Sequence, residues 1–374
     1  MKRFFGAIVQ YIKDTDRWLL LLCMIASAFS VVLLLGITNS EMVNSRRVVI
    51  VQAGAAVIGL TVAIIMSKID YHTMAKLWKF HVPFTLLLVL LTFFFRLQRS
   101  GADDKAWLPL PFGLSLQPAE LLKISFILTF SLHLSKVKEN LNSLKNIALL
   151  CVHGAIPTLL IHFQGDDGTA LVFLMIFLFI LFSAGVSWKY ILSAVGVLAV
   201  GIPVAWFGIM SNDQKLRVLS IFNPALDPQG IGYQQLKGRI AIGSGQIFGT
   251  GIFSGDHYYV PEIQNDFIFS FIGEALGFVG TIATLILLGA ICFKILWNTR
   301  HCSDDLGFFI CVGVFAMFSV QIMVNVGMCL SMLPVIGLTL PFLSAGGTSV
   351  VTLYLGIGLA LSVYVHNKPR LFYN

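Results

Sequence analysis

The sequence predicts an all-α, polytopic integral membrane protein with ten transmembrane helices. Of its 374 residues, 57% are hydrophobic and only 11% are charged, whereas soluble proteins average about 25% charged residues. So few charges could not cover the surface of a water-soluble protein, and so apolar a composition excludes a disordered chain. The apolar residues also fall into runs of the length that crosses a bilayer as a helix, about 20 residues.

Ten such runs divide the chain. They lie at about 18–38, 48–67, 80–97, 117–134, 147–163, 169–187, 190–210, 266–297, 307–329 and 346–366. The first run follows basic residues as in a signal peptide, but its Ala-x-Ala, Ala26 to Ala28, lies inside the run. We therefore expect an uncleaved first helix, and an even number of spans places both termini on one side of the membrane.

The distribution of cations predicts which side that is. Fifteen of the 25 lysines and arginines lie on the side of the termini, nine lie on the other side, and Lys123 lies within a span. Four of the nine are in a single long loop, which the positive-inside rule discounts, so we expect cytoplasmic termini. The net charge of +7 comes without a run of basic residues, so no nucleic-acid partner is expected. The six cysteines include no Cys-x-x-Cys pair, which argues against a zinc site or a disulfide framework.

Two connections on the predicted outer side are unusually long. The connection between the seventh and eighth spans, residues 211–265, is a large extracellular loop with turn signals and a Gly-rich stretch. Loops of this length are usually functional or disordered, and its Ile and Phe residues predict docking on the membrane surface. The connection at 98–116 contains Trp107, which fits either a site residue or an aromatic interface anchor. We expect one membrane domain over residues 1–374.

Charged residues within or beside the spans are the candidate functional groups, because charge at membrane depth is costly. Glu120 and Lys123 share one helical face, where they either neutralise each other or line a polar cavity for a charged head group. Asp166 is either the N-cap of the sixth helix or a site residue. Asp266 opens the predicted eighth helix as a cap or a general base, and Glu274, two turns further on, is expected on a similar face.

Four segments together resemble a known family. They are QPAELLK (117–123), DPQGIGYQ (227–234) with IAIGSG (240–245), PEIQNDFIFSFIGEALGFVG (261–280) and PFLSAGGTS (341–349). Over essentially its whole length the chain is similar to the SEDS family (shape, elongation, division and sporulation), the RodA/FtsW/SpoVE group, and to its RodA-like members. It departs from the usual family pattern at Ala106 before Trp107, at Gly165 before Asp166, and at Ala345.

The resemblance implies a peptidoglycan glycosyltransferase that polymerises lipid II on the outer face of the bacterial cytoplasmic membrane and releases undecaprenyl diphosphate. It implies a class B penicillin-binding protein (a transpeptidase) as partner, with membrane lipids around the apolar helices. Asp266 would be the general base or a metal ligand, a divalent cation such as Mg or Mn is possible, and no organic cofactor is expected. The residues expected to bind substrate or line its cavity are Glu120, Lys123, Trp107, Asp166, Arg217, Glu262, Glu274, Ser344, Gly346, Gly347 and Ser349.

Two other functions remain open from the residues. A transporter (flippase) that moves lipid II across the membrane would also suit ten spans and the Glu120–Lys123 pair. The clustering of specific polar features on the outer side, without a broken-helix pair that recurs in two halves, favours the enzyme. An inactive scaffold for a transpeptidase is disfavoured because Asp266 and its surroundings are intact.

Overall fold

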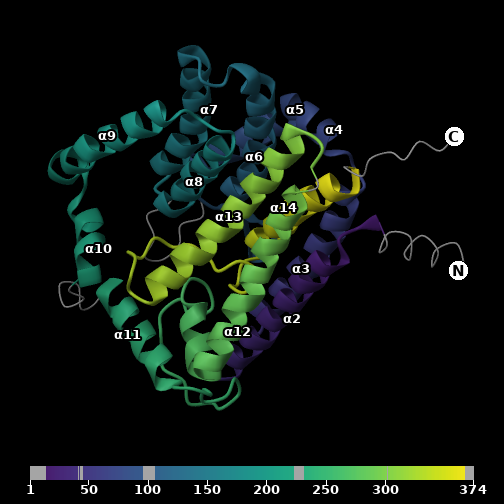
Figure 1. The fold of residues 1–374 in the computed structure, drawn as a ribbon. Helices are drawn as coiled ribbons and strands as arrows, with labels where there is room; N and C mark the ends of the chain where they lie inside the picture. Colours follow the sequence, from purple (N-terminus) through teal and green to yellow (C-terminus); the bar gives the residue numbers. More distant parts are fainter. Residues whose placement is uncertain are drawn as a thin grey trace, which may run out of the picture.

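Helices make up nearly all of the regular structure in the computed structural model, which describes residues 14–40, 42, 45–95, 106–222, 231–300 and 302–366 (Figure 1). The ten helices on the predicted apolar runs are α2 (Arg17–Asn39), α3 (Arg47–Ser67), α5 (Trp78–Thr92), α6 (Pro118–Val137), α7 (Leu144–Phe163), α8 (Asp167–Ser183), α9 (Trp188–Val204), α12 (Ile268–Thr299), α13 (Asp305–Cys329) and α14 (Gly347–His366). Between them lie α4 (Tyr71–Lys76), α10 (Asn212–Phe222), α11 (Ile231–Ser244) and short 3-10 or π turns at 111–113, 138–140 and 205–209.

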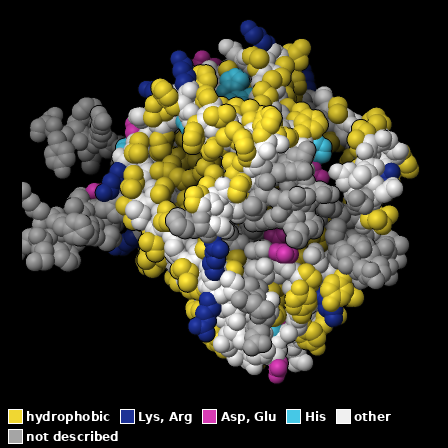
Figure 2. Space-filling view, turned by 180° about the vertical axis from the view of Figure 1, so that it is seen from behind, with side chains coloured by type: hydrophobic (Ala, Val, Ile, Leu, Met, Phe, Trp, Pro, Cys, Tyr) yellow, Lys and Arg dark blue, Asp and Glu magenta, His cyan; other side chains and the backbone are white. Residues whose placement is uncertain are grey.

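Seven of the helices that the structure describes are long and apolar enough to cross a membrane. They are α2, α3, α7, α9 with its π turn, α12, α13 and α14. Helices α5 and α8 are apolar but shorter, and the 20 residues of α6 include Glu120, Lys123 and Lys136. The multi-pass character is supported by the surface, where Figure 2 shows hydrophobic side chains gathered over the upper part of the view. The count of ten spans stays a prediction.

The helix ends follow from local chemistry. Asp16 accepts a hydrogen bond from Leu19 N at the start of α2, and Asp304 accepts one from Gly307 N at the start of α13. Pro118 occupies the first turn of α6, where a backbone N–H would have no partner within the helix, so its absence costs no hydrogen bond. Polar capping residues thus bound the apolar segments, as the free backbone groups of helix ends require.

The core lies around α13 and α14. Most of α13 is buried, and α14 packs closely on α3, where a Cβ atom on Gly59 would lie 2.6 Å from the ring of Tyr354. Helix α9 is the opposite case: within the described part of the chain none of its residues is buried, and Figure 1 shows it apart from the other long helices. The central helices therefore form the packed core, and α9 lies outside it.

The described residues of the long loop at 211–265 form helices and turns. The first part of its Gly-rich stretch forms α11. The chain directly after this helix lies so close to α12 that a Cβ atom on Gly245 would lie 2.0 Å from the carbonyl oxygen of Gly273. Glycines and Ile242 make the contact with α12. Phe248 and Phe253 are exposed, and their docking on the membrane surface stays a prediction. Residues 227–230 of the DPQGIGYQ segment lie outside the described residues.

The prediction of an all-α fold needs one correction. Residues Leu108–Leu110 (β1) and Leu114–Leu116 (β2) form an antiparallel hairpin with Pro109 opposite Ser115. Gly113 at its tip has a positive φ of 65°, which only glycine adopts at little cost. The hairpin is attached to α14 by a hydrogen bond of 3.0 Å from Thr348 Oγ1 to the carbonyl of Ser115. Three-residue strands are too short for side-chain periodicity to reveal.

The opposite end of the bundle, where α4 lies, is closed by a polar cluster. The ring of His72 lies between two carboxylates, with Nε2 2.6 Å from Asp304 and Nδ1 2.9 Å from Asp70. Tyr71 Oη donates to Asp304 at 2.9 Å. Partial burial alone would raise the pKa of Asp70, but hydrogen bonds from the His72 backbone and ring, with the charge of that ring, lower it overall. These contacts join α4 to the start of α13.

Candidate functional site

Asp266 lies in a series of turns before α12, not on the helix itself. The helix begins at Ile268 with Phe267 as its N-cap, so the expectation that Asp266 opens the helix is wrong by two residues. The turns are held by Glu262, which has a positive φ of 56° and whose carbonyl accepts from Asn265 N and Phe267 N. Because Asp266 precedes the first turn, helical spacing does not place Glu274 on its face.

A second segment, residues 330–346 between α13 and α14, supports the backbone around Asp266. Ser344 Oγ donates to the carbonyl of Asn265 at 2.6 Å, and Ala345 N donates to the carbonyl of Gln264 at 2.8 Å. A Cβ atom on Gly337 would lie 3.6 Å from Asp266 Oδ2. The Asp266 side chain is half-buried at this junction.

Asn325 on α13 joins the two segments. Its Nδ2 donates to the carbonyl of Asp266 at 2.8 Å and to the carbonyl of Leu338 at 2.7 Å. The side chain is fully buried. Sequence reasoning missed Asn325, although a polar residue in an otherwise apolar span is itself a signal of a functional or structural contact.

The first turns of α6 and α8 meet at the same end of the bundle. Asp166 Oδ1 accepts from Thr169 N at 2.9 Å, so Asp166 is the N-cap of α8, and its Oδ2 accepts from Gln117 Nε2 at 2.7 Å. A Cβ atom on Gly168 would lie 2.3 Å from the carbonyl oxygen of Ile336, which brings α8 against the 330–346 segment. The capping interpretation of Asp166 is therefore confirmed, with an added contact to α6.

Glu120 and Lys123 form the expected pair on one face of α6. Lys123 Nζ lies 2.8 Å from Glu120 Oε1, and the two side chains are 0% and 6% exposed, respectively. Glu120 Oε2 has no hydrogen-bond partner among the described residues. The two charges thus neutralise each other in the structure, and a role in holding a head group stays a prediction.

The PFLSAGGTS segment is held by a residue that the sequence did not single out. Gln52 on α3 donates through Nε2 to the carbonyls of Phe342 and Ser344 and accepts through Oε1 from Gly346 N at 3.1 Å. Gln52 is buried, and it supplies hydrogen bonds to backbone groups of this segment that have no helical partner. The neighbouring Gly347 begins α14, where Ser349 Oγ lies 3.3 Å from Thr339 Oγ1.

The remaining predicted site residues lie in different surroundings. Glu274 is buried on α12 and accepts from Tyr258 N in the long loop. Trp107 is half-buried immediately before β1, and Glu262 is exposed and accepts from Asn265 Nδ2 at 2.6 Å. Arg217 lies on α10, and its side chain is outside the part that the structure describes.

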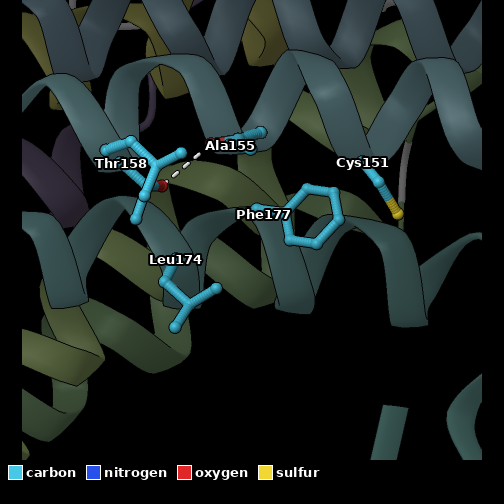
Figure 3. Close-up of a pocket in the computed structure, with 7 residues that line it drawn as sticks. Cys151, Ala155, Thr158, Leu174 and Phe177 are labelled. Carbon is cyan, nitrogen blue, oxygen red and sulfur yellow. Dashed lines mark hydrogen bonds between the residues drawn. The ribbon is translucent and has the colours of Figure 1, made fainter. Parts of the chain in front are cut away.

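The described residues offer no ready-made metal cage at this end of the bundle. Among the described residues, no three His, Cys, Asp or Glu side chains converge as metal ligands. A groove of about 250 Å³ lies elsewhere, between α7 and α8 (Figure 3), lined by Cys151, Gly154, Ala155, Thr158, Leu159, Leu174 and Phe177. Its lining is almost wholly apolar, so the groove offers no acid–base chemistry.

Comparisons with known proteins show which family the chain belongs to. The family model FTSW_RODA_SPOVE, described as a cell cycle protein, matches residues 14–369. The chain belongs to the FtsW/RodA/SpoVE family. This confirms the family that the four sequence segments predicted.

Relatives within the FtsW/RodA/SpoVE family include curated and solved proteins. The chain is 32% identical over 321 residues to the peptidoglycan glycosyltransferase MrdB of Escherichia coli (strain K12), covering 84% of this chain and 85% of that one. It is 31% identical over 323 residues to the stage V sporulation protein E of Bacillus subtilis, covering 83% and 85%. The structure superposes with a TM-score of 0.79 and 25% identity on a chain of a peptidoglycan synthase complex that coordinates polymerization and crosslinking, covering 95% and 98%.

Proposed function

We propose that this membrane protein is a peptidoglycan glycosyltransferase that polymerises lipid II into glycan strands, with Asp266 as general base. The observation that carries the proposal is the support of the Asp266 segment by hydrogen bonds from Asn325, Ser344 and Ala345. These bonds hold the backbone of residues 264–266, so the half-buried Asp266 carboxylate is attached to a backbone that is held in position. The names of the curated relatives support the same activity.

The chemistry requires one proton acceptor. The sugar 4-hydroxyl of the acceptor attacks the anomeric carbon of the lipid-linked donor, and the bond from that carbon to the diphosphate oxygen breaks. Asp266 takes the hydroxyl proton, and undecaprenyl diphosphate leaves with the bonding electron pair. The diphosphate needs charge neutralisation in place of an acid. Because Lys123 is fully buried and bound to Glu120, we assign this neutralisation first to Arg217.

The described residues supply few ligands for a divalent cation. Mg²⁺ is commonly bound by one or two carboxylates together with substrate phosphates, so Asp266 would hold such an ion only jointly with the diphosphate of the substrate. No three acidic, His or Cys side chains converge among the described residues. The steps above therefore assign no role to a metal.

The membrane arrangement follows the distribution of cations. Both termini are placed in the cytoplasm, and the Asp266 end of the bundle faces outward, where glycan strands are assembled. A class B penicillin-binding protein is the proposed partner, supported by the likeness to a chain of a complex that coordinates polymerization and crosslinking. The exposed apolar faces of the helices would hold membrane lipids and the substrate's lipid tails.

Polymerisation of purified lipid II by the protein in lipid nanodiscs, with and without a class B penicillin-binding protein, tests the proposal. We expect Asp266→Asn to lower the rate by at least about 100-fold, the lower part of the range for general-base catalysis. Glu139→Gln, an exposed carboxylate at the opposite end of the bundle, is the matched control and should retain full activity. An Asp266→Asn protein that folds and polymerises at the normal rate would contradict the proposal, and lipid II translocation without polymerisation would favour the transporter.

A further inference from the structure

We infer that His257 and Glu274 are positioning residues that fasten the chain on both sides of Asp266. The inference rests on the proposed role of Asp266 as the base. Tyr258 N donates to Glu274 Oε1 at 2.8 Å, and the ring of His257 lies beside the same oxygen, with Nδ1 at 3.6 Å. This contact closes a loop of chain from 258 to 274, and Asp266 lies eight residues from either end. Closing a loop restricts the conformations of everything inside it.

Next to this contact, α12 is broken, and the long loop bonds to the helix backbone at the break. Gly277 has φ 66° and ψ −165° inside the helix, so Phe278 N and Val279 N do not bond to the carbonyls one turn earlier. They donate instead to the carbonyls of Gln246 and Ile247. The vacated carbonyls of Glu274 and Ala275 accept from the backbone N–H groups of residues 250 and 251. The loop segment 246–251 thus replaces part of the helix's own hydrogen-bond ladder.

The side chains of His257 and Glu274 are buried and have few other polar partners. The side chains of His257 and Glu274 are 0% and 1% exposed. The edge of the His257 ring packs against Phe271 at a centroid distance of 4.9 Å, and Nε2 lies 3.3 Å from Ser254 Oγ. Glu274 Oε2 has no hydrogen-bond partner among the described residues. With so few donors nearby, the buried Glu274 carboxylate depends strongly on the Tyr258 N–H and on the His257 ring beside it.

This arrangement assigns Glu274 a role different from substrate binding. Both side chains are covered, so neither is placed to touch lipid II. They act through the backbone, by limiting the movement of the turns that carry Asp266. A displacement of about 1 Å at a catalytic group can cost as much as 100-fold in rate. Weakening the pair should therefore lower kcat and leave the KM for lipid II nearly unchanged.

Four variants test this in the lipid II polymerisation assay: Glu274→Gln, His257→Gln, their combination, and the control Asp256→Asn on an exposed neighbour. We expect each single variant to lose about tenfold or more in kcat with KM within about twofold of the parent. The double variant should be no slower than the slower single one, because the two residues act as a pair. Asp256→Asn should match the parent. Additive losses, a rise in KM alone, or unchanged kcat in both single variants would overturn the inference.

Hydrogen exchange separates local loosening from loss of the fold. In Glu274→Gln and His257→Gln, amides of residues 258–266 should exchange faster while those of α13 and α14 keep their protection. If Glu274→Gln does not fold, His257→Gln, on the loop side of the contact, decides the question. An Asp266→Asn protein in the same assay distinguishes the two proposals: if it is active, the proposed function fails, and if it is inactive while both pair variants have normal kcat, only the positioning role fails.

Discussion

Asn325 donates a hydrogen bond of 2.8 Å to the backbone carbonyl of Asp266, although 59 residues separate them in the sequence. The same amide nitrogen bonds to the carbonyl of Leu338, so one buried side chain holds together the segment that carries the proposed base and the segment that faces it. The geometry of the site thus depends on a helix, α13, that supplies no predicted catalytic group.

Removing this amide should damage both stability and activity. Asn325→Leu removes this donor from both carbonyls. The carbonyl of Asp266 keeps Cys329 Sγ at 3.6 Å, but the buried carbonyl of Leu338 loses its donor, and an unsatisfied buried group costs about 1–3 kcal/mol. We expect a lower midpoint of thermal unfolding in detergent and a polymerisation rate reduced by about tenfold or more. Ser319→Ala on the same helix is the control, because the Ser319 hydroxyl donates to the carbonyl of Ala316 within that helix. Equal melting midpoints for the two variants would show that the bridge does not stabilise the site.

The pair Glu120–Lys123 should behave as a unit in stability. Lys123→Met leaves a buried carboxylate without its cation, which typically costs about 3–5 kcal/mol. Glu120→Gln combined with Lys123→Met removes both charges, and we expect the double variant to unfold at a higher temperature than Lys123→Met alone. If the pair also binds a head group, the double variant should remain slow in lipid II polymerisation. A double variant with restored stability and normal rate would limit the pair to a structural role.

Gly243 in α11 and Gly245 directly after that helix provide a matched test of how the long loop docks. A Cβ atom on Gly245 would lie 2.0 Å from the carbonyl oxygen of Gly273, whereas one on Gly243 has no neighbour within 4 Å among the described residues. Gly245→Ala should destabilise the protein by about 1–3 kcal/mol through overpacking. Gly243→Ala should be neutral or stabilising by about 0.5–1 kcal/mol, since alanine favours a helix. Thermal unfolding and protease cleavage of the loop measure the contrast, and indistinguishable variants would contradict close docking on α12.

The cluster at the opposite end of the bundle should make stability depend on acid pH. Burial opposes the shift, but the hydrogen bonds and charge of His72 lower the pKa of Asp70 overall. A carboxyl with a lowered pKa stabilises the folded state above its unfolded pKa, about 3.9, and this contribution is lost as pH falls through the folded value. Asp70→Asn should therefore lower the melting midpoint at pH 7, with the difference from the parent shrinking below about pH 4. A difference independent of pH would show that the carboxylate charge is not responsible.

The sequence by itself determined the class and family of this protein, for physical reasons that are local. In apolar runs of spanning length, the backbone polar groups are satisfied within each run when it forms a membrane helix. Short motifs such as PEIQNDFIFSF and PFLSAGGTS are recognised because their residues are neighbours in the sequence. The capping role of Asp166 and the Glu120–Lys123 pair were also predictable, because their partners lie three residues away along a helix.

The tertiary structure decided how those motifs meet. Gln52 bonds to Ser344 across 292 positions, and the loop segment 246–251 bonds to the backbone groups of α12 that the break at Gly277 frees. The hairpin at 108–116, the docking of α11 and the start of α12 after Asp266 likewise depend on contacts with distant backbone. Hydrogen bonds between segments far apart in the chain leave no periodic pattern in the sequence, and these bonds hold the proposed base in place.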